Sequence, residues 1–333
     1  MKTYNRRAAM DRTLRWSVLG ASVGYGWPAL AQASYPRQAM KWIVPFPAGG
    51  GTDVVARLLA QSMSSALGQP MVVDNRPGAG TMIGGEAIAR ARPDGYTFGT
   101  VDVSTLALAP HLYARVPYRI QTDFSFIGGT TKFPFVLVVK PDFPARTLQD
   151  LISMARGKPE TLKYASPGAG GPNHLGMELF QRQMNVRMIH VPYRGDAPAL
   201  QDLLGGQIDM YLVNTAASLP YLQSGKLRAL GVAMSSRIQA LPDVPTFREA
   251  GVADFESYAW QGLAAPAGAP ADVVARLNAE LNKALALPEI TKRLQDMGVE
   301  AMSTTPTEFA ALVTQQAQLW GKVIREANVK LES

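Results

Sequence analysis

The sequence of 333 residues contains no cysteine and only three histidines. The absence of cysteine excludes a disulfide framework, a thiolate metal site and a cysteine nucleophile. His111, His174 and His190 lie far apart in the sequence and lack the spacing of metal ligands, which disfavours a zinc or haem enzyme. We therefore expect neither a metal nor a cofactor.

Several motifs of nucleotide-binding and hydrolytic enzymes are also missing. The sequence has neither the G-x-x-x-x-G-K-[ST] of phosphate-binding loops nor the G-x-S-x-G of nucleophile elbows. A dinucleotide fingerprint that started at Gly78 would need glycine at position 83, which is Ile83. These absences leave no motif that predicts a nucleotide ligand.

The first 33 residues resemble a secretory signal peptide. A basic segment leads into an apolar stretch over 16–30, and Ala31-Gln32-Ala33 provides a small-x-small cleavage pattern, so we expect cleavage after Ala33. Glycines and a proline interrupt the apolar stretch, which disfavours a membrane-spanning helix. The mature chain is therefore expected to be exported across the inner membrane.

The net charge of +7 belongs partly to this leader. The leader contains 5 of the 33 basic and 1 of the 26 acidic residues, which leaves 28 basic and 25 acidic residues, a net charge of +3. No dense run of lysine and arginine with interleaved aromatics occurs later in the chain. We therefore expect no nucleic-acid partner.

Strand-like and helix-like segments alternate along the mature chain, which predicts an α/β fold with mainly parallel sheets. Asp53 is expected to cap the first helix. Thr147–Asp150 and Thr305–Glu308 resemble capping boxes. The expected strands are 41–44, 71–73, 96–101, 135–139, 162–165, 188–191 and 208–212. The expected helices begin near 53, 86, 148, 173, 197, 270 and 306.

Two glycine-rich loops share one arrangement. Pro45–Thr52 and Ser166–Gly171 each follow an expected strand and precede an expected helix. A helix N-terminus offers unpaired N–H groups and a partial positive charge, which suit a carboxylate or phosphate. Neither loop contains arginine or lysine, so backbone N–H groups, Thr52, Ser166, Asn173 or water would hold the anion. The alternative is that both loops are only tight turns.

A secreted serine hydrolase that uses Ser166 and His174 is a second interpretation. These residues are eight positions apart, and no acid is placed to orient the histidine, so the sequence disfavours a triad. His190, between two apolar residues, is expected to be a hydrogen-bonded residue of a sheet.

Several sequence motifs that occur in a fixed order across 35–330 are typical of one protein family. The motifs are VPFPAGGGTDVVARLLA at 44–60, NRPGAG at 75–80, PDGYT at 93–97, SPGAGGPNHL at 166–175 and VPYRGDAPALQDLLGGQID at 191–209. With these motifs the chain resembles the Bug family, the periplasmic solute-binding proteins of tripartite tricarboxylate transporters. The resemblance implies a periplasmic location.

The resemblance implies a two-domain flytrap that closes on a small carboxylate. Domain 1 would comprise 34–133 plus 258–333 and domain 2 would comprise 134–257, joined by crossover strands. The chain would be a monomer that delivers its ligand to membrane permease subunits, or alternatively a sensor for a membrane receptor kinase. The ligand-binding residues would be Phe46, Pro47, Ala48, Gly49, Gly50, Thr52, Asp53, Ser166, Gly168, Gly170, Asn173, His174, Asn214, Trp260 and Gln261.

Two positions depart from the family's pattern. Asn214 stands where the family often has aspartate, and an amide can both donate and accept hydrogen bonds. A ligand with an ammonium group, such as an acidic amino acid, would therefore lose a charge partner there. Asp102 is an unusual acid near a strand end. If it lines the binding site, it would repel a dianion or pair with a cationic group. Trp260 would either form a wall of the site or pack in the core.

Overall fold

The computed structural model describes residues 35–331. The expected signal peptide and its cleavage site lie outside this range. Within it, no helix combines the length and the apolar character needed to cross a membrane.

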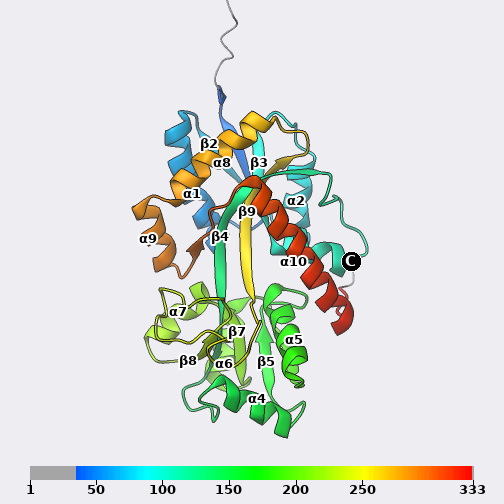
Figure 1. Cartoon of the computed structure of the whole chain (residues 1–333), viewed down its shortest axis with the longest axis vertical. Coiled ribbons are helices and arrows are strands. Elements are labelled where there is room, and N and C mark those ends of the chain that lie inside the picture. Colours follow the sequence, from blue (N-terminus) through cyan, green and yellow to red (C-terminus); the bar gives the residue numbers. More distant parts are fainter. Residues whose placement is uncertain (1–34, 332–333) are drawn as a thin grey trace, which may run out of the picture. The chain divides into compact units, whose positions relative to one another are not determined.

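The first sheet region consists of three parallel strands connected by helices (Figure 1). Strand β1 lies between β2 and β3, as expected for a β-α-β arrangement. Its elements are β1 (Met40–Val44), α1 (Gly51–Leu67), β2 (Met71–Asn75), the 3-10 helix η1 (Ala79–Thr81), α2 (Met82–Ala89) and β3 (Thr97–Asp102). A π-helix, η2 (Ser104–Leu108), and the short α3 (Ala109–Leu112) follow β3.

The second sheet region repeats this arrangement lower in the view of Figure 1. Strand β5 pairs in parallel with β6 and with β7. The elements are α4 (Leu148–Gly157), β5 (Lys163–Ser166), α5 (Pro172–Met184), β6 (Ile189–Pro192), α6 (Asp196–Gly205), β7 (Met210–Asn214), α7 (Thr215–Gln223) and β8 (Arg228–Val232). The alternation of strands and helices predicted from the sequence is confirmed in both regions.

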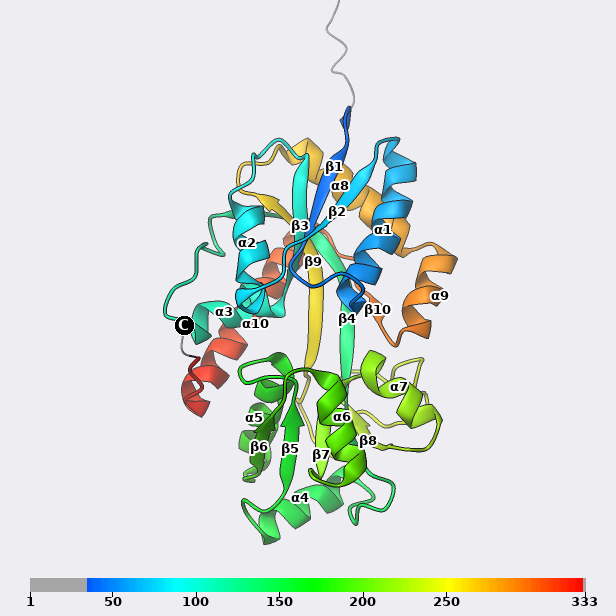
Figure 2. The same ribbon diagram turned by 180° about the vertical axis from the view of Figure 1, so that it is seen from behind.

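Two long strands, β4 (Phe124–Val139) and β9 (Tyr258–Pro266), connect the two regions (Figures 1 and 2). They pair with each other antiparallel from Phe124–Pro266 to Pro134–Tyr258. Strand β9 also pairs with β3, and β4 with β7 and β8, all antiparallel. The sheets are therefore mixed, with parallel pairing confined to their outer strands, and less parallel than the alternation alone predicted.

The sequence predicted only the last third of β4. Gly128 and Gly129 favour a break in a strand, and the register of β4 against β9 shifts beside both of them. A Cβ at Gly128 would lie 2.6 Å from Asn278 Nδ2, and one at Gly129 2.6 Å from Met302 Cε. The glycines thus allow close packing against the strand and do not end it.

The C-terminal segment returns to the first sheet region as α8 (Ala271–Leu285), α9 (Pro288–Asp296), the short β10 (Glu300–Ala301) and α10 (Pro306–Ala327). Helices α1 and α8 bury Leu59, Met63, Leu277 and Leu281 in one core cluster with Trp42. The predicted capping boxes are confirmed at Thr147–Asp150 of α4 and Thr305–Glu308 of α10. Helix α10 packs on β4, and its Phe309 meets Trp260 of β9 edge to face.

Gly262 of β9 sets how closely α10 approaches the sheet, because a Cβ there would lie 2.1 Å from Phe309 Cζ. We predict that Gly262→Ala lowers the free energy of unfolding by about 2 kcal/mol, since overpacking typically costs about 1–3 kcal/mol. Urea unfolding measures the loss. Gly157→Ala is the control, because no heavy atom lies within 4 Å of a Cβ there. Equal stability of the two variants would contradict this packing.

Candidate functional site

A cavity of about 460 Å³ lies where the two sheet regions meet β4 and β9. The first region and β9 contribute Phe46, Gly51, Thr52, Asp102, Val103, Ser104, Ala259, Trp260 and Gln261. Strand β4 and the second region contribute Phe133, Phe135, Pro172, Asn173, Asp196, Asn214, Ala216 and Ala217. A larger hollow of about 690 Å³ between α1 and α8 includes neither glycine-rich loop. We therefore take the smaller cavity as the candidate site.

Six of the fifteen residues named from the sequence line this cavity. They are Phe46, Thr52, Asn173, Asn214, Trp260 and Gln261. The other nine, Pro47, Ala48, Gly49, Gly50, Asp53, Ser166, Gly168, Gly170 and His174, do not line it in this structure. Most of these lie in the two loops just before α1 and α5, so they are neighbours of lining residues.

The N-termini of α1 and α5 reach the cavity from opposite sheet regions. Each begins after a glycine with nearly the same backbone conformation, Gly50 at φ −75° and ψ 165° and Gly171 at φ −71° and ψ 164°. Neither helix has a side-chain cap, although α4 and α10 have complete capping boxes. The first N–H groups of a helix have no partner within it. Both helix ends can therefore donate to an anion in the cavity.

The amide side chains of the site are held by the protein itself. Asn173 donates to the Leu212 carbonyl at 2.8 Å, and Gln261 donates to the Thr52 hydroxyl at 2.5 Å. Asn214 caps α7 by accepting the Ala217 N–H at 2.9 Å. These bonds fix the lining residues relative to the helix ends, so the site is largely ordered before any ligand enters.

Asp53 supports the first loop from outside the cavity. Its carboxylate accepts the Gly49 N–H at 2.9 Å, the Arg57 Nε–H at 2.9 Å and an amide N–H of Asn75 at 2.8 Å. The Arg57 hydrogen bond is the largest of the interactions that lower the pKa of Asp53 to about 2. The prediction that Asp53 caps α1 was wrong: Gly50 is the N-cap, and Asp53 lies in the first turn.

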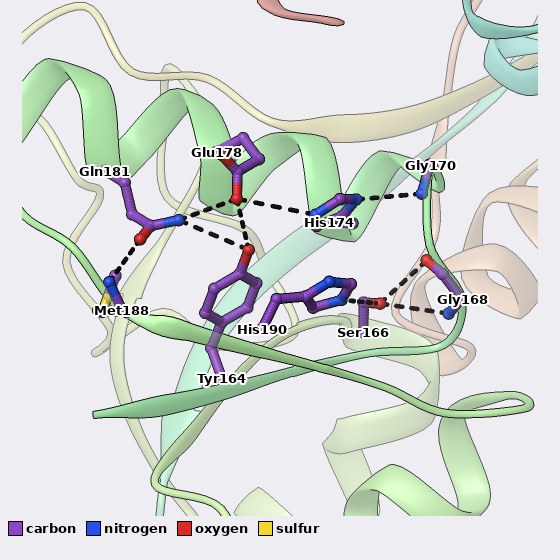
Figure 3. Close-up of polar contacts among 9 residues, drawn as sticks. All are labelled: Tyr164, Ser166, Gly168, Gly170, His174, Glu178, Gln181, Met188 and His190. Carbon is purple, nitrogen blue, oxygen red and sulfur yellow. Dashed lines mark hydrogen bonds and ion pairs between the residues drawn. The ribbon is translucent and has the colours of Figure 1, made fainter. Parts of the chain in front are cut away.

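A buried polar cluster supports the second loop (Figure 3). The His190 Nε2–H donates to Ser166 Oγ at 2.7 Å, because the Ser166 hydroxyl itself donates to the Gly168 carbonyl at 2.9 Å. His174 Nδ1 accepts the Gly170 N–H at 3.0 Å. The two imidazole rings stack with centroids 3.9 Å apart. The neutral histidines thus hold two groups of the loop in place, the Ser166 hydroxyl and the Gly170 N–H.

Glu178 completes this cluster on the side away from the loop. It accepts the Tyr164 hydroxyl at 2.7 Å and lies 3.7 Å from His174 Nε2. Ser166 pairs with His190 and not with His174, and its side chain is completely buried. A buried hydroxyl that does not line the cavity cannot reach a substrate there, so the geometry does not support the hydrolase interpretation.

Asp196, Ser104, Phe133 and Phe135 line the cavity but were not named as site residues from the sequence. Asp196 lies in the GDAPA segment at 195–199. A glycine precedes a helix there, as in the two glycine-rich loops, and this pattern could have indicated a site residue. The phenylalanines belong to β4, which the sequence indicated only in part. Trp260 has both predicted roles: it lines the cavity, and its ring is fully buried against Phe309.

Comparison with known proteins assigns the chain to a family. The family model described as tripartite tricarboxylate transporter family receptor matches residues 55–329. The chain is 35% identical to Protein BugT of Bordetella pertussis over 97% of this chain and 100% of that protein.

Solved structures agree with this comparison. A structure of a periplasmic transporter is 41% identical with a TM-score of 0.77, covering 89% of this chain and 99% of that one. A Rhodopseudomonas palustris protein solved with adipate is 34% identical, with a TM-score of 0.78 and coverage of 90% and 100%. MatC of Rhodopseudomonas palustris, solved with malate, is 35% identical, with a TM-score of 0.73 and coverage of 87% and 100%.

The histidine cluster predicts a pH dependence of stability. Burial lowers the pKa of His174 and of His190 from 6.5 to about 4. Between pH 6.5 and 4 the unfolded chain therefore binds more protons than the folded one, and the free energy of unfolding falls as the pH falls. One pKa unit corresponds to about 1.4 kcal/mol, so His174 contributes on the order of 3 kcal/mol to this loss.

Urea unfolding at pH 7, 5.5 and 4.5 measures this dependence. His190→Gln keeps a donor for Ser166 and removes one titrating group, so we expect a shallower loss of stability toward low pH than in the wild type. Equal pH dependence of the two proteins would show that folding does not lower the pKa of His190.

Proposed function

Since the chain belongs to the tripartite tricarboxylate transporter receptor family, we propose that it captures a small organic carboxylate in the cavity between its two sheet regions. The family consists of solute-binding receptors and not of enzymes. The uncapped N-termini of α1 and α5 carry this proposal, because they approach one cavity from opposite regions.

The proposed contacts are backbone N–H groups at 51–52 and 173, together with the Thr52 hydroxyl. A carboxylate there gains hydrogen bonds and the favourable field of two helix dipoles. No lysine or arginine lines the cavity. The adipate and malate in the related structures are carboxylates, which supports the same ligand chemistry in this chain.

Closure would occur between a domain of 34–133 plus 258–333 and a domain of 134–257, with β4 and β9 as the connecting strands. Each helix end alone contributes half of the proposed anion site. A ligand that contacts both helix ends binds the closed arrangement more tightly, and so shifts the population toward it.

We further propose that the mature chain is a periplasmic monomer that presents its bound ligand to the permease subunits of a tripartite transporter. The receptor family and the relatives described as periplasmic support this assignment. Pull-down of the purified permease with liganded and ligand-free receptor tests it, and equal capture of both forms would contradict recognition of the closed state.

A thermal-shift screen over dicarboxylates, amino acids and aromatic acids tests carboxylate capture. A ligand at a hundredfold excess over its Kd stabilises the folded chain by about 2.7 kcal/mol. We expect at least one compound to raise the Tm, and the same compound to reduce the radius of gyration in solution scattering. Binding without compaction would refute the closure mechanism.

Gly50→Asp and Gly171→Asp test the two helix ends separately. Aspartate is a favourable N-cap residue, so we expect unchanged or higher stability. Its carboxylate would occupy the helix end and repel the ligand, so we expect each variant to weaken binding of the screened carboxylate at least tenfold. Calorimetry measures the affinity. Thr147→Asp, which places the same charge at the N-cap of α4, should not weaken binding; unchanged affinity in Gly50→Asp would contradict the site.

A further inference from the structure

The charged side chains that line the cavity are both acidic. Asp102 lies at the end of β3 and Asp196 at the start of α6, so the two sheet regions contribute one each. No lysine, arginine or histidine lines the cavity, and no ion pair joins either carboxyl group to another described residue. A second negative charge on a ligand would therefore meet carboxylates without a compensating cation.

The hydrogen bonds around Asp102 make it an acceptor. Its Oδ1 accepts the Thr105 N–H at 2.8 Å and the Thr105 hydroxyl at 2.6 Å. Because that hydroxyl donates to Asp102, the Thr81 hydroxyl must donate to Thr105 across their 2.8 Å contact. The backbone and side chain of Ser104 donate to the same carboxyl group. These donors favour the ionised form of Asp102.

Asp196 also accepts hydrogen bonds from neighbouring side chains. It accepts the Tyr211 hydroxyl and, at 3.0 Å, an amide N–H of Asn214. Asn214 uses its carbonyl oxygen to cap α7, so only its amide group faces Asp196. An aspartate at 214 would place two carboxylates in contact, whereas asparagine leaves the negative charge at 196. With asparagine at 214, one carboxylate, that of Asp196, remains in this part of the cavity.

Burial of the Asp102 side chain disfavours the ionised carboxylate, whereas these hydrogen-bond donors favour it. The side chain is about 95% buried, and this burial raises the pKa of its carboxyl group above the ordinary value. A cation brought into the cavity by a ligand would favour the ionised form that burial disfavours. Asp102 therefore offers an acceptor that no described cationic side chain pairs with.

We propose that the ligand is a carboxylate that also carries an ammonium group, and that Asp102, with Asp196, selects this cation. This inference rests on the proposed function, because the ligand carboxylate lies at the N-termini of α1 and α5. The aromatic rings of Phe46, Phe133 and Phe135 also line the cavity and suit an apolar stem. The ligand class is therefore a zwitterionic amino acid with an apolar spacer, and not a dicarboxylate.

A matched series of six-carbon probes tests the preference by calorimetry at pH 7. Adipate carries two carboxylates, 6-aminohexanoate one carboxylate and one ammonium, and hexanoate one carboxylate alone. We expect the wild type to bind 6-aminohexanoate at least tenfold more tightly than adipate or hexanoate. The four-carbon and five-carbon dicarboxylates, ω-amino acids and monocarboxylates are measured in the same way, because the length of the cavity decides which spacer fits.

Two variants assign the preference to the named residues. Asp102→Asn keeps an oxygen that can accept from Thr105, so the fold is retained, and it should weaken 6-aminohexanoate binding at least tenfold while hexanoate binding changes less than threefold. Asp196→Asn should act in the same direction. Asp142→Asn removes an equal charge from an exposed residue outside the cavity and should change neither affinity.

The outcomes separate this inference from the proposed function. Tighter binding of the dicarboxylates than of the amino acids at every length would overturn the inference and retain carboxylate capture. A wild-type preference that survives in both Asp102→Asn and Asp196→Asn would also overturn it. No binding of any probe in the three series, nor of any compound in the wider screen, would overturn both proposals.

Discussion

The antiparallel pairing of β4 with β9 is the interaction on which the site depends. Strand β4 pairs in both sheet regions and β9 pairs with β3 in the first, and their mutual pairing, which contains two register shifts, brings the end of β3 and the start of α5 to one cavity. The close approach of α10 at Gly262 holds Trp260 against Phe309, so the wall of the cavity is also part of the core. A shift in this pairing would separate the two helix ends.

The proposed site would bind an anion without a basic side chain among the described residues that line it. Glycine at the N-caps of α1 and α5 leaves the helix N–H groups uncovered, whereas a serine or aspartate cap would satisfy them internally. The supporting groups lie behind the loops: Asp53 with Arg57 and Asn75 behind the first, and the stacked His174 and His190 behind the second. Their hydrogen bonds and charges fix the backbone conformation of the loops, and none of these side chains lines the cavity.

The charged side chains of the cavity are separate from the helix ends. Helix ends that bind a carboxylate would use only backbone N–H groups, which are common to many ligands. The charged residues of the lining, Asp102 and Asp196, would then decide which carboxylates bind. Asn214 is part of the same arrangement because its amide donates to Asp196 and its carbonyl oxygen caps α7.

The sequence alone determined the local features. Strand and helix alternation, the two capping boxes and the two glycine-rich loops follow from periodicity and from the backbone preferences of neighbouring residues, which act over a few positions. The ordered motifs likewise identified the family. Only the tertiary structure decided which residues meet in the cavity, because pairing between β4 and β9 joins segments more than a hundred positions apart. Phe133 enters the site through that pairing and Phe135 through the pairing of β4 with β7, whose Asn214 also contacts Asp196. Ser166 and His174 are held in a buried cluster outside the cavity.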